Sequence, residues 1–115
     1  MSNIKLGINI HLPVSINGIE NDAVQEIAFL FKQRRDPNAE TLKAAAYKAD
    51  GSGDVRFSDG VYYVPFSRED TYRFKPQTPF YLDTRITLKG TTDNPLTPIT
   101  QLVMDTSLFG EGDDL

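Results

Sequence analysis

Apolar and polar side chains alternate most clearly near the middle of the chain. On one side of this alternation stand Phe80, Leu82, Thr84, Ile86 and Leu88, and on the other Tyr81, Asp83, Arg85, Thr87 and Lys89. A period of two is the signature of a strand with one buried and one solvated face. The pattern predicts a strand over residues 79–89, and the apolar run VYYVPF predicts another over 61–66.

A polar corner, residues 67–71 (SREDT), follows the second of these segments. Ser67 followed three positions later by Asp70 resembles a capping box for one helical turn, with Asp in place of the usual Glu. Glu69 and Asp70 could instead act as an acid–base pair if a cleft held their carboxylates about 5–10 Å apart. Neighbouring carboxylates in a polar turn usually face solvent or cap backbone amides, so the structural role is favoured.

The N-terminal third of the chain predicts two strands. Residues 4–16 alternate loosely, and Pro13 cannot donate a ladder hydrogen bond, so we expect one kinked strand at a sheet edge. The dipeptide Asn17-Gly18 predicts a turn. Over residues 24–33, Ile27, Phe29 and Phe31 alternate with Ala28 and Leu30. Apolar residues on both faces predict a central strand that is covered on both sides at one end.

Residues 36–50 (DPNAETLKAAAYKAD) carry conflicting signals. Asp36 as a cap, Pro37 at the first helical position, the alanine run and Gly51 as a stop all favour a helix. The flanking strands and short connections favour a strand over 41–48. We predict the strand, with its inward side chains at Leu42, Ala44 and Ala46.

Two more strands are expected over 54–57 and 98–107, with turns at 50–54, 58–60 and 90–94. The spacing Asp50-x-Ser52-x-Asp54 resembles the start of a calcium loop. Val55 and Val61 occupy the positions that such a loop gives to Gly and Glu, so a plain hairpin loop is expected. The strands predict one domain over residues 1–108, followed by an acidic, glycine-rich and flexible tail over 109–115.

Composition narrows the chemistry. The 115 residues carry a net charge of −4, which argues against nucleic acid as the main partner. The one basic cluster, residues 32–35 (KQRR), is expected to be a solvated strand end or loop. The chain has no cysteine, and its single histidine, His11, is expected to be exposed on the first strand. We therefore predict no catalytic, cofactor-binding or metal site, and the short apolar runs predict no membrane partner.

Tyrosine content raises a different possibility, a β-sandwich that binds carbohydrate. Tyr62, Tyr63 and Tyr72 could stack on sugar rings, although packing within the sheets explains them with fewer assumptions. The chain has no tryptophan, the best side chain for stacking on sugars. Carbohydrate binding remains the alternative function.

The run VYYVPFSREDTYRF followed by FYLDTRITLKG resembles a family pattern, as does the upstream AFLFKQ. It is similar to small structural proteins of tailed phages and prophages of Gram-positive bacteria, and to the N-terminal immunoglobulin-like domain of their baseplate upper proteins. The matching residues are Glu69 to Thr71, Tyr81, Arg85 to Leu88 and Gly90. The chain stops at Leu115, without the coiled-coil or fibre region of the longer proteins.

The resemblance implies a non-enzymatic structural protein of the virion, associated with the tail or baseplate and present in the host cytoplasm during assembly. It implies other virion structural proteins as partners, and self-assembly as a further possibility. Contacts through exposed strand edges or through the sandwich surface are expected. Taken with the strand pattern, we predict an all-β, immunoglobulin-like β-sandwich of about seven strands.

Overall fold

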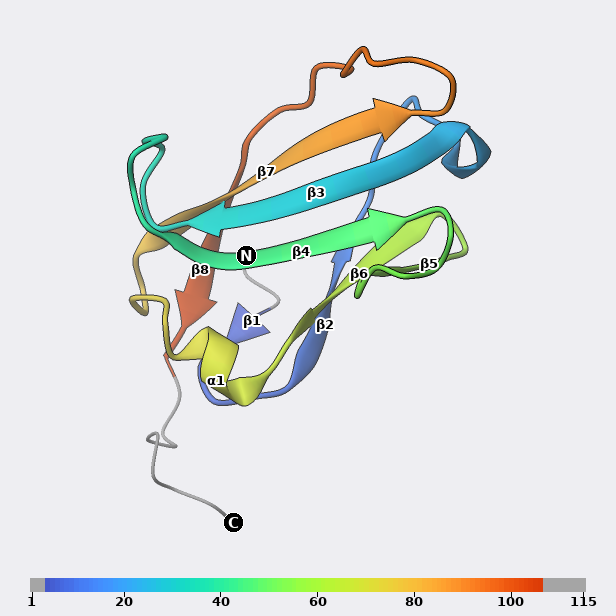
Figure 1. The fold of residues 1–115 in the computed structure, drawn as a ribbon. Helices are drawn as coiled ribbons and strands as arrows, with labels where there is room; N and C mark the ends of the chain where they lie inside the picture. The colour runs from blue at the N-terminus through green and yellow to red at the C-terminus, as the bar shows by residue number, and fades with distance from the viewer. Residues whose placement is uncertain (1–3, 107–115) are drawn as a thin grey trace.

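The computed structural model describes residues 4–106 and contains two β-sheets that pack against each other (Figure 1). The larger sheet has the order β1 (Ile4–Lys5), β8 (Thr100–Asp105), β7 (Pro79–Leu88), β3 (Val24–Lys32) and β4 (Thr41–Lys48). The smaller sheet has the order β2 (Ile10–Val14), β6 (Val61–Phe66) and β5 (Arg56–Ser58). Two short helical segments complete the fold, η1 (Asn21–Ala23) and α1 (Arg68–Thr71).

The strand order is that of an immunoglobulin-like sandwich. In such domains the strands called B, E and D form one sheet, and G, F, C and C′ form the other. Strands β2 to β8 follow this division in chain order, with β2-β6-β5 as one sheet and β8-β7-β3-β4 within the other. The predicted all-β sandwich is therefore confirmed, with eight strands in place of about seven.

The extra strand arises at the N-terminus, where one kinked strand over 4–16 was the wrong prediction. Gly7 has a φ of 79°, a conformation that ends β1 and redirects the chain. β1 then pairs in parallel with β8, whereas β2 pairs with β6 in the opposite sheet. Pro13 does not break the strand but lies within β2 opposite Tyr63, on a sheet edge as predicted.

Aromatic side chains fill the space between the sheets. Phe31 of β3 meets Phe66 of β6 edge-on, with ring centroids 5.0 Å apart, and Phe74 meets Phe80 of β7 at 4.7 Å. All four are buried, and burying one such ring is worth roughly 2–3 kcal/mol. The alternation predicted for β7 is confirmed, because Phe80, Leu82 and Ile86 are buried in this core.

β3 is an interior strand of the larger sheet, between β7 and β4, as predicted. Its inner side chains, Ile27, Phe29 and Phe31, are buried. The prediction that its other face is also covered at one end is wrong. Leu30, on the outer face, is 37% exposed. The outer face of this sheet therefore offers apolar surface to solvent.

β4 is a strand, so the helical alternative for residues 36–50 is excluded. Leu42 is buried as predicted, but the inward position predicted for Ala44 is wrong. Ala45 lies opposite Phe29 and is buried, whereas Ala44 lies opposite Leu30 and is exposed. A register shift beside Phe31 lets Leu42 be buried as well. This bulge breaks the strict alternation on which the prediction relied.

The predicted bounds of the other strands hold to within about two residues. β5 covers Arg56–Ser58 instead of 54–57, and β8 covers Thr100–Asp105 within the predicted 98–107. Asp59 and Gly60 form the two-residue turn between β5 and β6, and both have positive φ. The last predicted strand position, 107, and the predicted tail over 109–115 lie outside the described residues.

Candidate interaction surface

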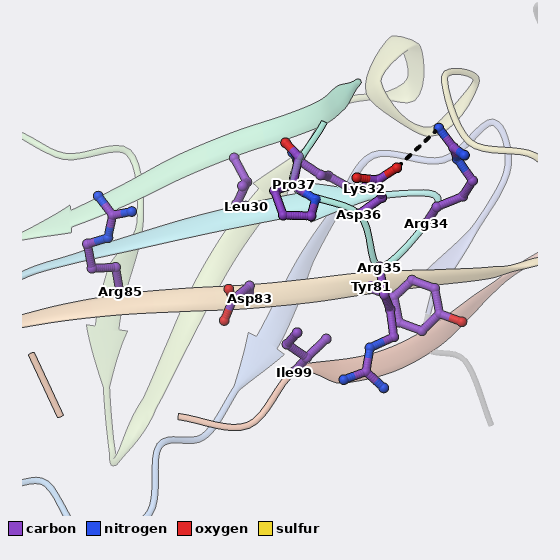
Figure 2. A pocket seen from close by; sticks show the side chains of 10 residues that line it. All are labelled: Leu30, Lys32, Arg34, Arg35, Asp36, Pro37, Tyr81, Asp83, Arg85 and Ile99. Atoms are coloured by element: carbon purple, nitrogen blue, oxygen red, sulfur yellow. Dashed lines mark hydrogen bonds and ion pairs between the residues drawn. The ribbon is translucent and has the colours of Figure 1, made fainter. Parts of the chain in front are cut away.

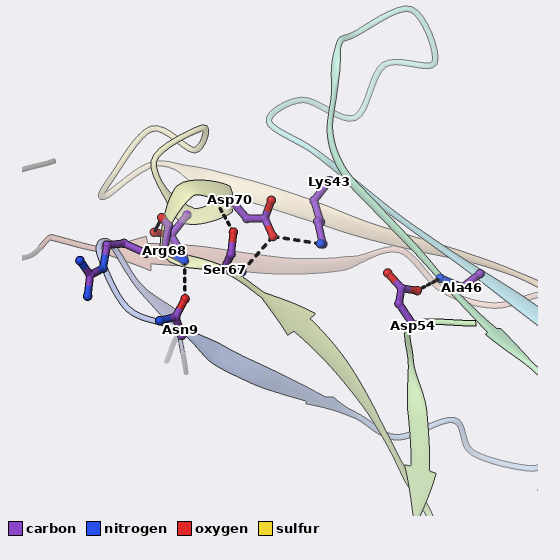
Figure 3. Close-up of polar contacts among 8 residues, drawn as sticks. Asn9, Lys43, Ala46, Asp54, Ser67, Arg68 and Asp70 are labelled. Carbon is purple, nitrogen blue, oxygen red and sulfur yellow. Dashed lines mark hydrogen bonds and ion pairs between the residues drawn. The ribbon is translucent and has the colours of Figure 1, made fainter. Parts of the chain in front are cut away.

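The corner after β6 contains the predicted capping box (Figure 3). The Asp70 amide donates to Ser67 Oγ at 3.1 Å, and the Ser67 amide donates to Asp70 Oδ2 at 2.9 Å. Lys43 Nζ of β4 donates to the same carboxylate oxygen at 2.9 Å. Asp70 is therefore a structural carboxylate, and it does not form an acid–base pair with the exposed Glu69.

These contacts also set the ionisation of Asp70. Its partial burial alone would raise the pKa, but the hydrogen bonds from Ser67 and the contact with Lys43 outweigh that effect, so the net pKa lies below the ordinary value of 3.8. The side chain is thus held as a carboxylate at neutral pH.

The same corner holds the segment between β1 and β2 in place. Thr71 is fully buried, and its hydroxyl accepts a hydrogen bond from the Gly7 amide at 2.9 Å while donating to the Arg68 carbonyl at 2.6 Å. The Arg68 amide donates to Asn9 Oδ1 at 2.8 Å (Figure 3). The corner over residues 67–71 is therefore a joint that fixes the N-terminal segment.

In the loop after β4, both aspartates are engaged within the protein. Asp50 Oδ1 accepts hydrogen bonds from the Ser52 hydroxyl and amide, and these hold the pKa of Asp50 below its ordinary value. Asp54 Oδ1 accepts from the Ala46 amide at 2.8 Å (Figure 3). Within residues 4–106, no group of three or more His, Cys, Asp or Glu side chains is placed to hold a metal ion.

Of the residues singled out from the sequence, His11 lies on β2, Tyr62 and Tyr63 on β6, and Tyr72 at the end of α1. His11 is exposed on β2, opposite Pro65. Tyr62 is only 3% exposed and packs edge-on against Tyr47, and its hydroxyl accepts a hydrogen bond from Asn21 Nδ2 at 2.9 Å. Burial raises the pKa of Tyr62. Tyr62 is thus part of the core and not a platform for a sugar.

The exposed edges of both sheets are short or obstructed. β1 has two residues, β5 has three, and β2 contains Pro13. On β4 the Ala46 amide is bonded to Asp54, the Ala46 carbonyl accepts from the Val55 amide, and the Thr41 carbonyl accepts from Arg73. Such features prevent the addition of another strand. The faces of the sandwich are therefore better suited to binding than its edges.

Three large apolar residues are exposed in the described part of the chain: Leu30, Leu96 and Ile99, at 37%, 100% and 41%. They line two adjoining hollows on the outer face of the larger sheet, with volumes of about 380 and 440 Å³. Both hollows include Leu30, Asp83 and Arg85. The apolar surface is thus concentrated on one face and not scattered.

The smaller hollow has a basic rim, and we call it the basic hollow (Figure 2). Its apolar part is Leu30 and Ile99, and its cations are Lys32, Arg34, Arg35 and Arg85. The Arg35 guanidinium lies 5.9 Å from the centroid of the Tyr81 ring, and Lys32 Nζ donates to the Pro37 carbonyl at 2.7 Å. Four cations face two anions, Asp36 and Asp83, in a chain whose net charge is −4.

The predicted position of the basic cluster is confirmed, because it spans the end of β3 and the loop after it, and Arg34 and Arg35 are exposed. Sequence reasoning missed that Tyr81 and Arg85 of β7 join it. The available signal was the polar face of β7, on which Tyr81, Asp83 and Arg85 alternate. It could be used only with the knowledge that β7 pairs with β3.

No protein-family model, curated protein or solved structure matches this chain. The described residues contain no helix long and apolar enough to cross a membrane. What the fold and surface define is a class: an all-β sandwich with obstructed edges and one apolar, basic-rimmed outer face.

Proposed function

We propose that this chain is a non-enzymatic structural protein of a tailed phage or prophage particle, associated with the tail or baseplate. It acts by binding other virion structural proteins and resides in the virion after assembly in the host cytoplasm. The class rests on the resemblance of residues 28–33 and 61–90 to that family. The exposed apolar face of the larger sheet supports the mode of action.

The observation that carries the binding role is the gathering of Leu30, Leu96 and Ile99 on one face. Contiguous exposed apolar surface marks interaction sites in soluble proteins. Covering a side chain such as Leu96 is worth roughly 2 kcal/mol, and the charged rim then fixes the orientation of the partner. The obstructed edges favour docking on this face over strand addition.

The decisive experiment is co-expression with the proteins encoded beside this gene, followed by affinity capture. The double variant Leu96→Ser/Ile99→Ser should lose capture of a tail or baseplate protein while keeping the unfolding midpoint of the wild type, because both side chains are exposed. The matched control His11→Ser/Lys89→Ser changes exposed residues elsewhere and should still capture the tail or baseplate protein. A wild-type protein that is strictly monomeric and captures none of these proteins contradicts the proposal.

Carbohydrate binding has less support than protein binding. Tyr62 belongs to the core, and the Arg35 guanidinium already lies over the Tyr81 ring in the basic hollow. A saccharide titration followed by NMR tests this alternative directly. If tyrosine signals alone shift saturably and the capture experiment also fails, carbohydrate binding is the function and the proposed structural role is wrong.

A further inference from the structure

The charge of the basic hollow restricts what can bind there. Its lining carries a net charge of +2, so two copies that met hollow to hollow would bring like charges together. Like-charge contacts at an interface cost several kcal/mol, which disfavours a symmetric face-to-face dimer. The occupant should instead be acidic, with an apolar part for Leu30 and Ile99.

A segment of the chain itself has this character. Residues 107–115 have the sequence SLFGEGDDL, in which two apolar residues, Leu108 and Phe109, precede three acids, Glu111, Asp113 and Asp114. We propose that the basic hollow of one copy binds residues 107–115 of a second copy. The carboxylates would pair with the arginine side chains of the rim, and Phe109 would cover the exposed faces of Leu30 and Ile99.

The reach of the chain argues for a second copy over the same copy. Ile99 precedes β8, which runs away from the apolar part of the basic hollow toward Asp105. Six residues of extended strand span roughly 20 Å, whereas the four residues from Asp105 to Phe109 reach at most about 14 Å. Phe109 would therefore approach Ile99 of its own chain only if residues 106–109 doubled back fully extended along β8, and no such constraint applies between copies.

The contact joins two different surfaces, so each copy still has a free hollow and a free segment after one contact forms. Head-to-tail contacts of this kind generate rings or open filaments. The inference rests on the proposed function, since it names one contact by which a structural protein would assemble. It adds the surface, the occupant and the polarity of that contact.

Charge reversal on each side provides the test, with self-association measured by analytical ultracentrifugation. Arg35→Glu/Arg85→Glu and Asp113→Lys/Asp114→Lys should each weaken association about 100-fold, roughly tenfold for each reversed charge. An equimolar mixture of the two variants should restore association. The unchanged segment of the first variant then meets the unchanged hollow of the second, and the reversed hollow meets the reversed segment. The control Lys75→Glu/Lys89→Glu makes the same change in net charge as Arg35→Glu/Arg85→Glu, at exposed positions outside the basic hollow. It should associate like wild type.

Each outcome decides between the possibilities. Loss in both variants with rescue in the mixture supports the proposal, as does weakening between about 0.05 M and 0.5 M salt. Self-association that survives both reversals overturns the contact but leaves the proposed function standing. A monomeric wild type with concentration-independent chemical shifts overturns the contact between copies. If that wild type also captures no virion protein, the proposed function fails with it.

Discussion

Lys43 of β4 and Asp70 of α1 form an ion pair of 2.9 Å between residues far apart in the chain. The two side chains are only 15% and 26% exposed, and the Lys43 ammonium lies 5.7 Å from the centroid of the Phe66 ring. A largely shielded cation beside the core needs a counter-charge. The carboxylate that caps the corner therefore also neutralises the lysine and ties the corner to the larger sheet.

Replacing Asp70 by alanine should lower the free energy of unfolding by about 2–3 kcal/mol. About 1 kcal/mol of this comes from the lost cap, and the rest from leaving Lys43 without its counter-charge. Urea unfolding measures the loss. Asp93→Ala, at an exposed loop position, should change stability by less than about 0.5 kcal/mol. A loss of only about 1 kcal/mol in Asp70→Ala, the amount expected from the cap alone, would show that the Lys43 contact contributes nothing.

The same carboxylate should make stability depend on pH on the acid side. Burial raises the pKa of Asp70, but the Ser67 and Lys43 contacts lower it by more than burial raises it, so the folded pKa lies below the unfolded value of 3.8. A depressed folded pKa gives stabilisation that is present above the unfolded value and is lost as the pH falls through the folded pKa. The difference in unfolding free energy between wild type and Asp70→Asn should be constant at about pH 5–7 and shrink below about pH 4. A difference that stays constant into that acidic range would contradict this.

Gly53 permits the loop after β4 to approach the backbone of Ala46 closely, and this loop obstructs the edge of β4. A Cβ atom at this position would lie 2.3 Å from the Ala46 carbonyl oxygen, so Gly53→Ala must displace the loop that carries Asp54. We expect a loss of about 2–4 kcal/mol and a greater tendency to aggregate, because the edge of β4 is then exposed. Thermal unfolding with light scattering measures both effects.

Gly18→Ala is the matched control for that substitution. Gly18 has a φ of 81°, but a Cβ atom at this position would meet no other atom within 4 Å. Only backbone strain of about 1–2 kcal/mol is therefore expected, without aggregation. If both glycine variants behaved alike, contact with Ala46 would not be the reason for Gly53.

Local patterns were sufficient to predict β7 and the corner over residues 67–71. The alternation in β7 and the spacing of Ser67 and Asp70 depend on residues a few positions apart, so the sequence alone predicts them. The break at Gly7 was missed because the residues around it alternate loosely, and only the partners of β1 and β2 show that they enter different sheets.

The basic hollow could not be predicted for the same reason. Lys32 and Tyr81 are far apart in the chain and become neighbours only through the pairing of β3 with β7. The prediction of which β4 side chains point inward failed at three successive alanines, residues 44–46, because they show no difference in polarity. There the register against β3, with its bulge, decides which side chain is buried.

That reversal of faces in β4 gives the last prediction. Ala45 is 8% exposed and lies opposite Phe29, whereas Ala44 is exposed and lies opposite Leu30. Ala45→Asp places a carboxylate in the core and should lower the unfolding free energy by about 3 kcal/mol or more, against less than about 1 kcal/mol for Ala44→Asp. Aspartate disfavours a strand at either site, so the comparison isolates burial. Urea unfolding of both variants measures it, and a larger loss at Ala44 would mean that the opposite face of β4 is turned toward the core.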